Sequence, residues 1–255
     1  MWTLPEVWTP LLVAVLFVVV FLYGVSKTAM PVAGVLASPL IVAALTPTTA
    51  TGFTVPLLII GDFIALGLYR QHADWRLIRK LVPGVLLGFL ITALLFRFLS
   101  IEALSRIVGV LILSSVGLEV WRQRREGADH RDLPEMSNKG VIIFFGALAG
   151  VTSMAANAGG TAMSLYLVKM RVSMLVFMGT STWFFFVLNS LKVPFAISLG
   201  LITPASLWAD LWFLPVLVVG AIAGVVIFRR MSQVVFVRVA LSLSALGALW
   251  LIVRG

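Results

Sequence analysis

A few charged and amide side chains interrupt otherwise apolar stretches of this sequence, and they are the residues best placed to do chemistry. Lys27, Asp62 and Lys192 stand inside apolar segments, and Asn189 lies three residues before Lys192. A lysine at the bilayer centre costs about 2.5–3.5 kcal/mol on insertion scales, so one that is retained there usually has a function. We predict that both lysines and Asn189 bind an anion. Asp62 is predicted to carry a coupling proton or to pair with one of the lysines.

Each of these residues also has a simpler interpretation. Lys27 becomes an interfacial anchor if the helices on both sides of it cross the membrane fully, and Lys192 can snorkel toward the headgroups. Glu119 and Asp210 stand near the ends of apolar segments. We expect both acids to be interfacial.

Two stretches combine small and hydroxyl residues with a helix breaker. Residues 23–34 read YGVSKTAMPVAG and residues 150–161 read GVTSMAANAGGT. Backbone groups freed by a break in hydrocarbon must face protein or a water-filled cavity. The helix that starts after a break points free N–H groups outward and has a partial positive charge. Two such ends facing each other would form an anion site, and its candidate substrate-binding residues are Thr28, Asn157, Gly159 and Gly160.

The small residues in these stretches have two alternative roles. Glycines also allow helices to pack closely. The hydroxyls of Ser26, Thr28, Thr152 and Ser153 are expected to bond to carbonyls of their own helices.

Hydroxyl residues also open two later segments. Thr51 stands beside Gly52, and Thr180 and Ser181 follow Gly179. We predict that these hydroxyls line a polar, substrate-binding cavity, although helix capping explains such positions equally well.

Several classes of chemistry lack the residues that they need. The chain has no cysteine, and His72 and His130 both lie in polar stretches, so we expect no metal site and no cofactor. It has no P-loop, His-Glu-x-x-His or Gly-x-Ser-x-Gly motif, which argues against an enzyme.

Composition identifies the medium that surrounds the chain. Apolar residues make up 61% of the 255 residues and charged residues only 11%, whereas soluble domains have roughly 45–50% and 25%. The apolar residues form ten runs near the ~20 residues that cross a bilayer. These runs are 9–28, 31–46, 49–69, 76–98, 101–121, 140–156, 158–169, 173–199, 205–228 and 232–253. The sequence predicts an all-α polytopic membrane protein.

Two of the runs, 31–46 and 158–169, are short for a full crossing. Each forms either a short crossing or a re-entrant half-crossing hairpin with the run before it, giving about 8–10 transmembrane segments. The net charge of +9 comes from lysines and arginines gathered on one side of the predicted segments. This bias puts that side in the cytoplasm and both termini outside, and it indicates no nucleic-acid partner.

The two halves of the chain align with each other. Residues 81–122 match residues 213–254 without a gap, so that Pro83 meets Pro215 and Gly88 meets Gly220. Earlier in the chain Gly24 meets Gly150. We predict a first repeat over 1–122, a cytoplasmic linker loop over 123–139 and a second repeat over 140–255. Each repeat has an odd number of crossings, so the repeats are inverted, as in many secondary transporters.

The layout resembles the TauE/SafE sulfite exporter family of bacterial permeases over nearly the whole chain. The resemblance rests on the duplicated helices, on residues 150–160, on the Gly179–Thr180–Ser181 entry and on the paired Pro83…Gly88 and Pro215…Gly220 helices. The first half departs from it, because Met30 to Ala33 stand where several glycines are expected.

The resemblance implies a multi-pass protein of the bacterial inner membrane, in which the termini that the charge bias puts outside would be periplasmic. It also implies export of small sulfur-containing anions such as sulfite, sulfoacetate or other organosulfonates. Its partners would be the anion and the lipid bilayer, and a homodimer stays open. The alternatives are an intramembrane enzyme or assembly factor using Asp62 and Lys27, and an anion channel, against which the lack of charged rings argues.

Overall fold

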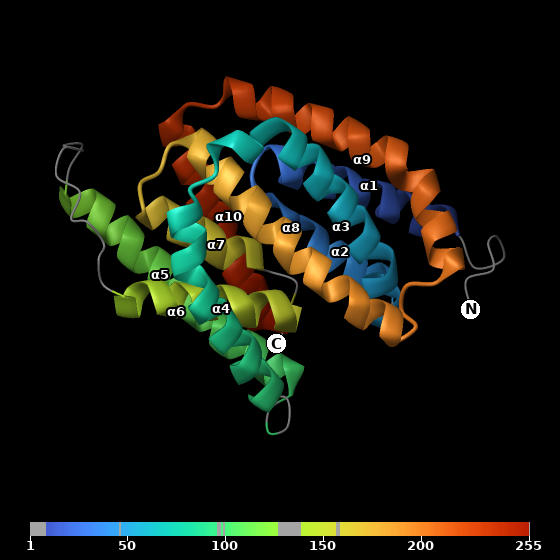
Figure 1. Cartoon of the computed structure of the whole chain (residues 1–255), viewed down its shortest axis with the longest axis horizontal. Helices are drawn as coiled ribbons and strands as arrows, with labels where there is room; N and C mark the ends of the chain where they lie inside the picture. The colour runs from blue at the N-terminus through green and yellow to red at the C-terminus, as the bar shows by residue number, and fades with distance from the viewer. Residues whose placement is uncertain are drawn as a thin grey trace. The chain divides into compact units, whose positions relative to one another are not determined.

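The chain forms a helical structure in the computed structural model, which describes residues 9–45, 47–95, 98, 100–126, 139–156 and 159–254 (Figure 1). No strand occurs within these residues. In chain order the elements are α1 (Pro10–Thr28), the 3-10 helix η1 (Pro31–Leu36), α2 (Ala37–Ala44), α3 (Pro47–Tyr69), the 3-10 helix η2 (Arg70–His72), α4 (Trp75–Leu95), α5 (Ile101–Glu126), α6 (Lys139–Ala156), α7 (Gly159–Lys169), α8 (Met174–Ser198), α9 (Pro204–Arg230) and α10 (Gln233–Arg254).

Five of the described helical stretches are long and apolar enough to cross a bilayer. They are Pro10–Thr28, Thr49–His72, Met174–Ser198, Pro204–Arg230 and Gln233–Val253. The 11 residues of α7 rise only about 16 Å, roughly half of the hydrocarbon thickness. The chain is therefore a polytopic helical membrane protein that includes elements too short to span by themselves.

Both predicted helix breaks are present, and one predicted boundary is wrong. The α1 helix ends at Thr28 before Pro31, and α6 ends at Ala156 before α7 starts at Gly159. The polar stretch after residue 121, however, stays helical through Glu126, so the predicted linker over 123–139 begins too early. Arginine, glutamine and glutamate are good helix formers, and a helix can continue past the end of its apolar run.

The chain divides into two compact units, each built from both halves of the sequence. Unit 1 comprises residues 1–73 and 178–231, and unit 2 comprises residues 74–177 and 232–255. The units do not coincide with the predicted repeats, which remain a prediction.

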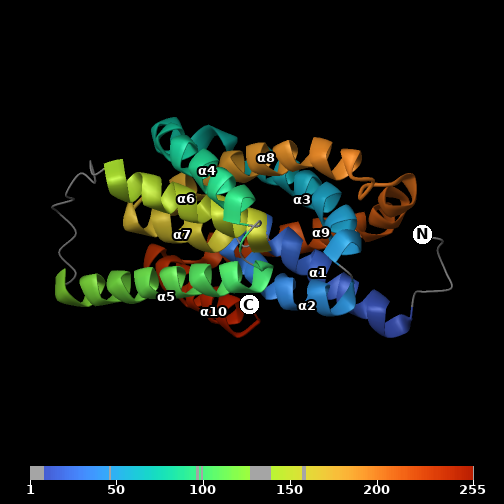
Figure 2. The ribbon, with the colours of Figure 1, turned by 90° about the horizontal axis from the view of Figure 1, so that it is seen from below.

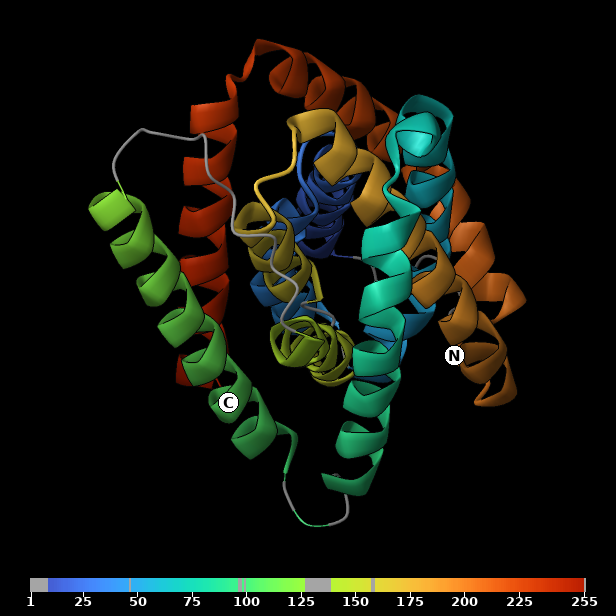
Figure 3. The ribbon, with the colours of Figure 1, turned by 60° about the vertical axis from the view of Figure 1, so that its left-hand side comes forward.

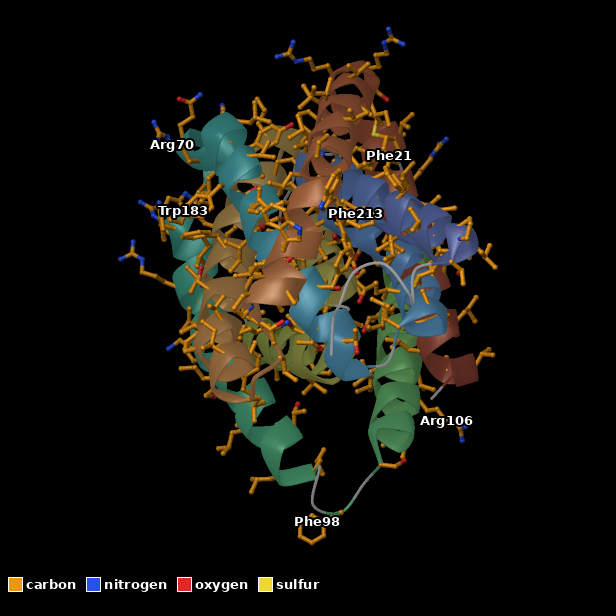
Figure 4. The ribbon with its side chains drawn as sticks, turned by 90° about the vertical axis from the view of Figure 1, so that its right-hand side faces the viewer. Phe21, Arg70, Phe98, Arg106, Trp183 and Phe213 are labelled. Carbon is orange, nitrogen blue, oxygen red and sulfur yellow. The ribbon has the colours of Figure 1, made fainter. Side chains whose placement is uncertain are left out.

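Unit 1 is organised around the parallel helices α1 and α9, which lie side by side in Figure 1. The rings of Phe17 and Phe213 lie 5.1 Å apart, and further along both helices Thr28 contacts Ala221. Figure 4 labels Phe21 and Phe213 on the two helices. A Cβ added to Gly24 would lie 2.7 Å from the Ala221 backbone nitrogen, so this close approach requires glycine.

Unit 2 uses the same kind of contact between α4 and α6. A Cβ at Gly84 would lie 2.9 Å from the Gly146 Cα, and one at Gly150 would lie 2.5 Å from the Val85 carbonyl oxygen. Figures 2 and 3 show α10 running beside α5. In each unit, glycines therefore let two helices approach at backbone distance.

Candidate functional site

The end of α1 places Lys27 inside unit 1. Lys27 stands in the last turn of α1, and the helix stops because Pro31 lacks a backbone N–H and restricts the residue before it. Met30 is accordingly extended, with φ −169° and ψ 117°. Only 8% of Lys27 is exposed, so its ammonium needs a partner within the protein.

That partner is Asp62 on α3. The Lys27 ammonium lies 2.5 Å from one Asp62 carboxylate oxygen, and the Asn189 amide on α8 donates to the other oxygen over 2.7 Å. Asp62 is completely buried. The predicted pairing of Asp62 with Lys27 is confirmed, and both carboxylate oxygens have a donor.

One face of α8 completes this group, which we name the Lys27–Asp62–Asn189 cluster. Phe185 and Lys192 are spaced four before and three after Asn189, so they share its face of the helix. The Lys27 ammonium lies 5.7 Å from the centre of the Phe185 ring, within cation–π range. Lys192 is within electrostatic reach of both Lys27 and Asp62. Both lysines therefore interact with the Asp62 carboxylate, Lys27 by direct contact and Lys192 over a longer distance.

Two members of this environment were missed from the sequence. Phe185 belongs to the aromatic run 183–186, and its place one helical turn before Asn189 is the signal that could have identified it. Gly61 provides space for Lys27, because a Cβ there would lie 2.9 Å from the Lys27 Cγ. Its position next to Asp62 gives no hint of this contact.

Thr28 has a structural role in the described contacts. Its hydroxyl donates to the Ala221 carbonyl of α9 over 2.7 Å, and its own carbonyl accepts from the Tyr69 hydroxyl. The predicted own-helix bonds are confirmed for three residues: Ser26 donates to the Tyr23 carbonyl, Thr28 also donates to the Gly24 carbonyl over 3.3 Å, and Thr152 donates to the Leu148 and Ala149 carbonyls.

The structure does not gather the remaining unit 1 candidates around the cluster. Thr51 and Asp62 are eleven residues apart on α3, and Thr180 and Asn189 are nine apart on α8, which are separations of about 16 Å and 14 Å along each helix. Ser181 follows Thr180, and all three hydroxyl residues lie away from the Lys27–Asp62 pair along their helices. Their role in lining a substrate-binding cavity stays a prediction.

The beginning of α8 packs against the end of α3. A Cβ at Gly179 would lie 2.6 Å from the His72 carbonyl carbon. The Trp183 indole donates to the Arg70 carbonyl over 3.3 Å, and Figure 4 labels both residues. This end of α8 therefore anchors the helix on α3.

Unit 2 holds the remaining predicted residues. Gly159 and Gly160 are the first residues of α7. A Cβ at Gly159 would lie 3.0 Å from the Ser153 Cβ, so the start of α7 packs closely against α6. Asn157 lies outside the described residues. The substrate roles of these three residues, and the meeting of the two helix breaks, remain predictions.

Two acids expected at the membrane interface are buried within the protein. Asp210 is 2% exposed and Glu119 is 3% exposed, and their depth in the bilayer stays a prediction. Closeness to the end of an apolar run does not report whether neighbouring helices cover the side chain. The described residues contain no cluster of three or more His, Cys, Asp or Glu that could hold a metal ion.

Comparison with known proteins gives one result. The sequence model described as sulfite exporter TauE/SafE matches residues 16–251, nearly the whole chain. No curated protein and no solved structure matches. With its apolar helices, its broken helix ends and a match over this length, the chain belongs to the sulfite exporter TauE/SafE family of membrane transporters.

Proposed function

We propose that this protein is a secondary transporter that exports small sulfur-containing anions, such as sulfite, sulfoacetate or other organosulfonates. It would act in the bacterial inner membrane with both termini in the periplasm. The observation that carries the proposal is the Lys27–Asp62–Asn189 cluster, in which a buried ion pair has a second lysine beside it. The family match supports the same class of cargo.

The donors of the cluster suit a small oxyanion. Sulfite and sulfonate groups present oxygens that accept hydrogen bonds, and ammonium and amide groups donate them. Lys27 and Lys192 bring two ammonium groups close to the Asp62 carboxylate, and Asn189 brings an amide N–H. An anion that enters this group would therefore meet several donors at once.

Asp62 also provides a way to couple the anion to a proton. Its carboxylate faces Lys27 from α1 and both Asn189 and Lys192 from α8. When Asp62 takes up a proton, Lys27 loses its counter-ion and becomes available to the anion. Proton and anion then bind together, and loss of the proton restores the ion pair and expels the anion.

Uptake into proteoliposomes tests this proposal. We expect saturable uptake of labelled sulfite or sulfoacetate that responds to a pH gradient, and exchange against unlabelled anion from the other side, which a channel does not require. Lys192→Gln removes one charged donor and is expected to lower uptake by roughly tenfold to a hundredfold.

Lys169→Gln is the matched control, because Lys169 lies at the end of α7 and outside the cluster. It is expected to transport as the unchanged protein does. Folded protein that moves none of these anions, or Lys192→Gln protein with undiminished uptake, would overturn the proposal.

A further inference from the structure

A second buried carboxyl lies in unit 1, on α9. Asp210 is 2% exposed, and neither of its carboxylate oxygens has a hydrogen-bond partner among the described residues. Buried polar groups are nearly always hydrogen-bonded, so each exception needs an explanation. Neither the packing of α9 nor the Lys27–Asp62–Asn189 cluster uses this side chain.

The described parts of α1 and α3 that pack on α9 bring no charge to Asp210. Phe213, one turn further along α9, packs between Phe17 of α1 and Phe53 of α3. Residues 10–26 of α1 and 47–61 of α3 contain no charged residue. The ionisable groups of these helices all lie further along the bundle or at its far end: Tyr23 and Lys27 on α1, Asp62 and Tyr69 on α3, and Arg229 and Arg230 on α9. The one charged residue on the unit 1 part of α8 is Lys192.

An ionised carboxylate is costly in such a place. Burying an isolated charge in an apolar medium is so unfavourable that the group takes up a proton instead. An ionisable residue inside the membrane is also a functional candidate by default. The surroundings of Asp210 therefore favour its acid form over a bare carboxylate.

Asp210 and Asp62 lie at different depths of the same unit. Phe53 and Phe213 mark a common level, since their rings are 5.3 Å apart. Asp210 lies three residues before Phe213 on α9, and Asp62 lies nine residues after Phe53 on α3. At the rise of an α-helix, the two acids are about 18 Å apart along the helix axes. Tyr23 and Thr54, which are joined by a side-chain hydrogen bond, follow the same level on α1 and α3. Hydroxyls that can accept and donate a proton thus stand between the two acids.

We propose that Asp210 is a second proton-binding carboxyl of unit 1, which loads a proton at the end of α9 remote from Arg229 and Arg230 and delivers it toward Asp62. The proton leaves the Asp210 carboxyl, the Asp62 carboxylate accepts it, and Asp210 is reloaded from solution. Delivery to Asp62 rests on the proposed proton-coupled function, whereas proton binding by Asp210 does not.

Infrared spectroscopy of the whole protein in lipid nanodiscs tests proton binding directly. A protonated carboxyl has a carbonyl stretch separate from that of a carboxylate. We expect a protonated-carboxyl band that disappears in Asp210→Asn, is retained and shifted in Asp210→Glu, and is unchanged in the buried-acid control Glu119→Gln. A wild-type spectrum without such a band, or a band that survives in Asp210→Asn, would overturn the inference.

Transport then separates this inference from the proposed function. In Asp210→Asn, uptake driven by a pH gradient is expected to fall to its level without a gradient, while anion exchange at equal pH continues. Full proton-driven uptake in Asp210→Asn overturns the inference and leaves the proposed function standing. An Asp210 band in a protein that transports no sulfur anion supports the proton site and removes the proposed cargo. A band that responds to Na⁺ at fixed pH overturns the inference in favour of a cation site.

Discussion

The glycine-lined helix pairs of the two units are alike in packing and different in charge. In unit 1, Gly24 of α1 meets Gly220 and Ala221 of α9, and in unit 2, Gly150 of α6 meets Gly88 and Val85 of α4. The predicted duplication aligns Gly24 with Gly150 and Gly88 with Gly220. The same pair of aligned glycines therefore makes the close contact in each unit, with the order of the halves exchanged.

The charged residues do not follow this pattern. In the same alignment Ser153 stands where Lys27 stands, and Asn189 stands where Asp62 stands. The Asp62 carboxylate and the Asn189 amide are hydrogen-bonded to each other in unit 1. The helix packing thus follows the predicted duplication, whereas the ionic residues do not: Lys27, Asp62 and Lys192 all lie in unit 1.

The largest difference between the units is expected when the ion pair is broken. Lys27→Met leaves Asp62 buried with no opposite charge in contact, and loss of one partner of a buried pair costs about 3–5 kcal/mol. In unit 2, Lys169 lies 5.6 Å from the Phe145 ring, nearly the same as Lys27 and Phe185. Lys169→Met is expected to cost about 1 kcal/mol or less, as measured by thermal unfolding in detergent.

A double substitution separates folding from transport at this pair. Lys27→Met with Asp62→Asn removes both charges and keeps an acceptor for Asn189, so we expect most of the stability to return. Anion uptake should stay lost, because the donor and the proton carrier are both gone. Recovery of uptake in the double variant would show that the pair serves the fold alone.

The sequence predicts the helices better than it predicts their partners. Apolar runs locate each helix, and Pro31 marks the first break, because these signals are local. Contacts such as Lys27 with Gly61, or Asn189 with Asp62, depend on how α1, α3 and α8 are registered against each other. Asp210 shows the same limit, since its burial is decided by α1 and α3 and not by its position in an apolar run.

The shared packing of the two units predicts matching losses of stability. Gly24→Ala and Gly150→Ala each place a Cβ within 2.7 Å of a neighbouring backbone atom, and overpacking of this kind costs about 1–3 kcal/mol. Gly117→Ala on α5 is the control, because a Cβ there meets nothing within 4 Å. A loss of stability in only one of the variants Gly24→Ala and Gly150→Ala would show that the aligned glycines are not equivalent.

A smaller and more local effect is expected beside Lys27. In Gly61→Ala, the new Cβ crowds the Lys27 Cγ at 2.9 Å, and a flexible side chain can yield at a cost of about 1 kcal/mol. Because the ammonium must then move relative to Asp62, anion uptake should fall more than the loss of stability explains. Gly67→Ala on the same helix meets nothing within 4 Å and should leave uptake unchanged. Equal uptake by both variants would remove Gly61 from the site.

The smallest expected difference concerns two buried threonines, one in each unit. The Thr28 hydroxyl donates across the helix interface to the Ala221 carbonyl, whereas the Thr92 hydroxyl donates to the Gly88 carbonyl of its own helix. Hydrogen bonds between membrane helices contribute about 0.6 kcal/mol on average, so Thr28→Val should lower stability by roughly that amount. Thr92→Val breaks only a bond to a carbonyl that the helix already uses, and it should change stability less. A larger loss for Thr92→Val would mean that α4 and α6 depend on side-chain bonding as α1 and α9 do, and the two helix pairs would then differ in charge alone.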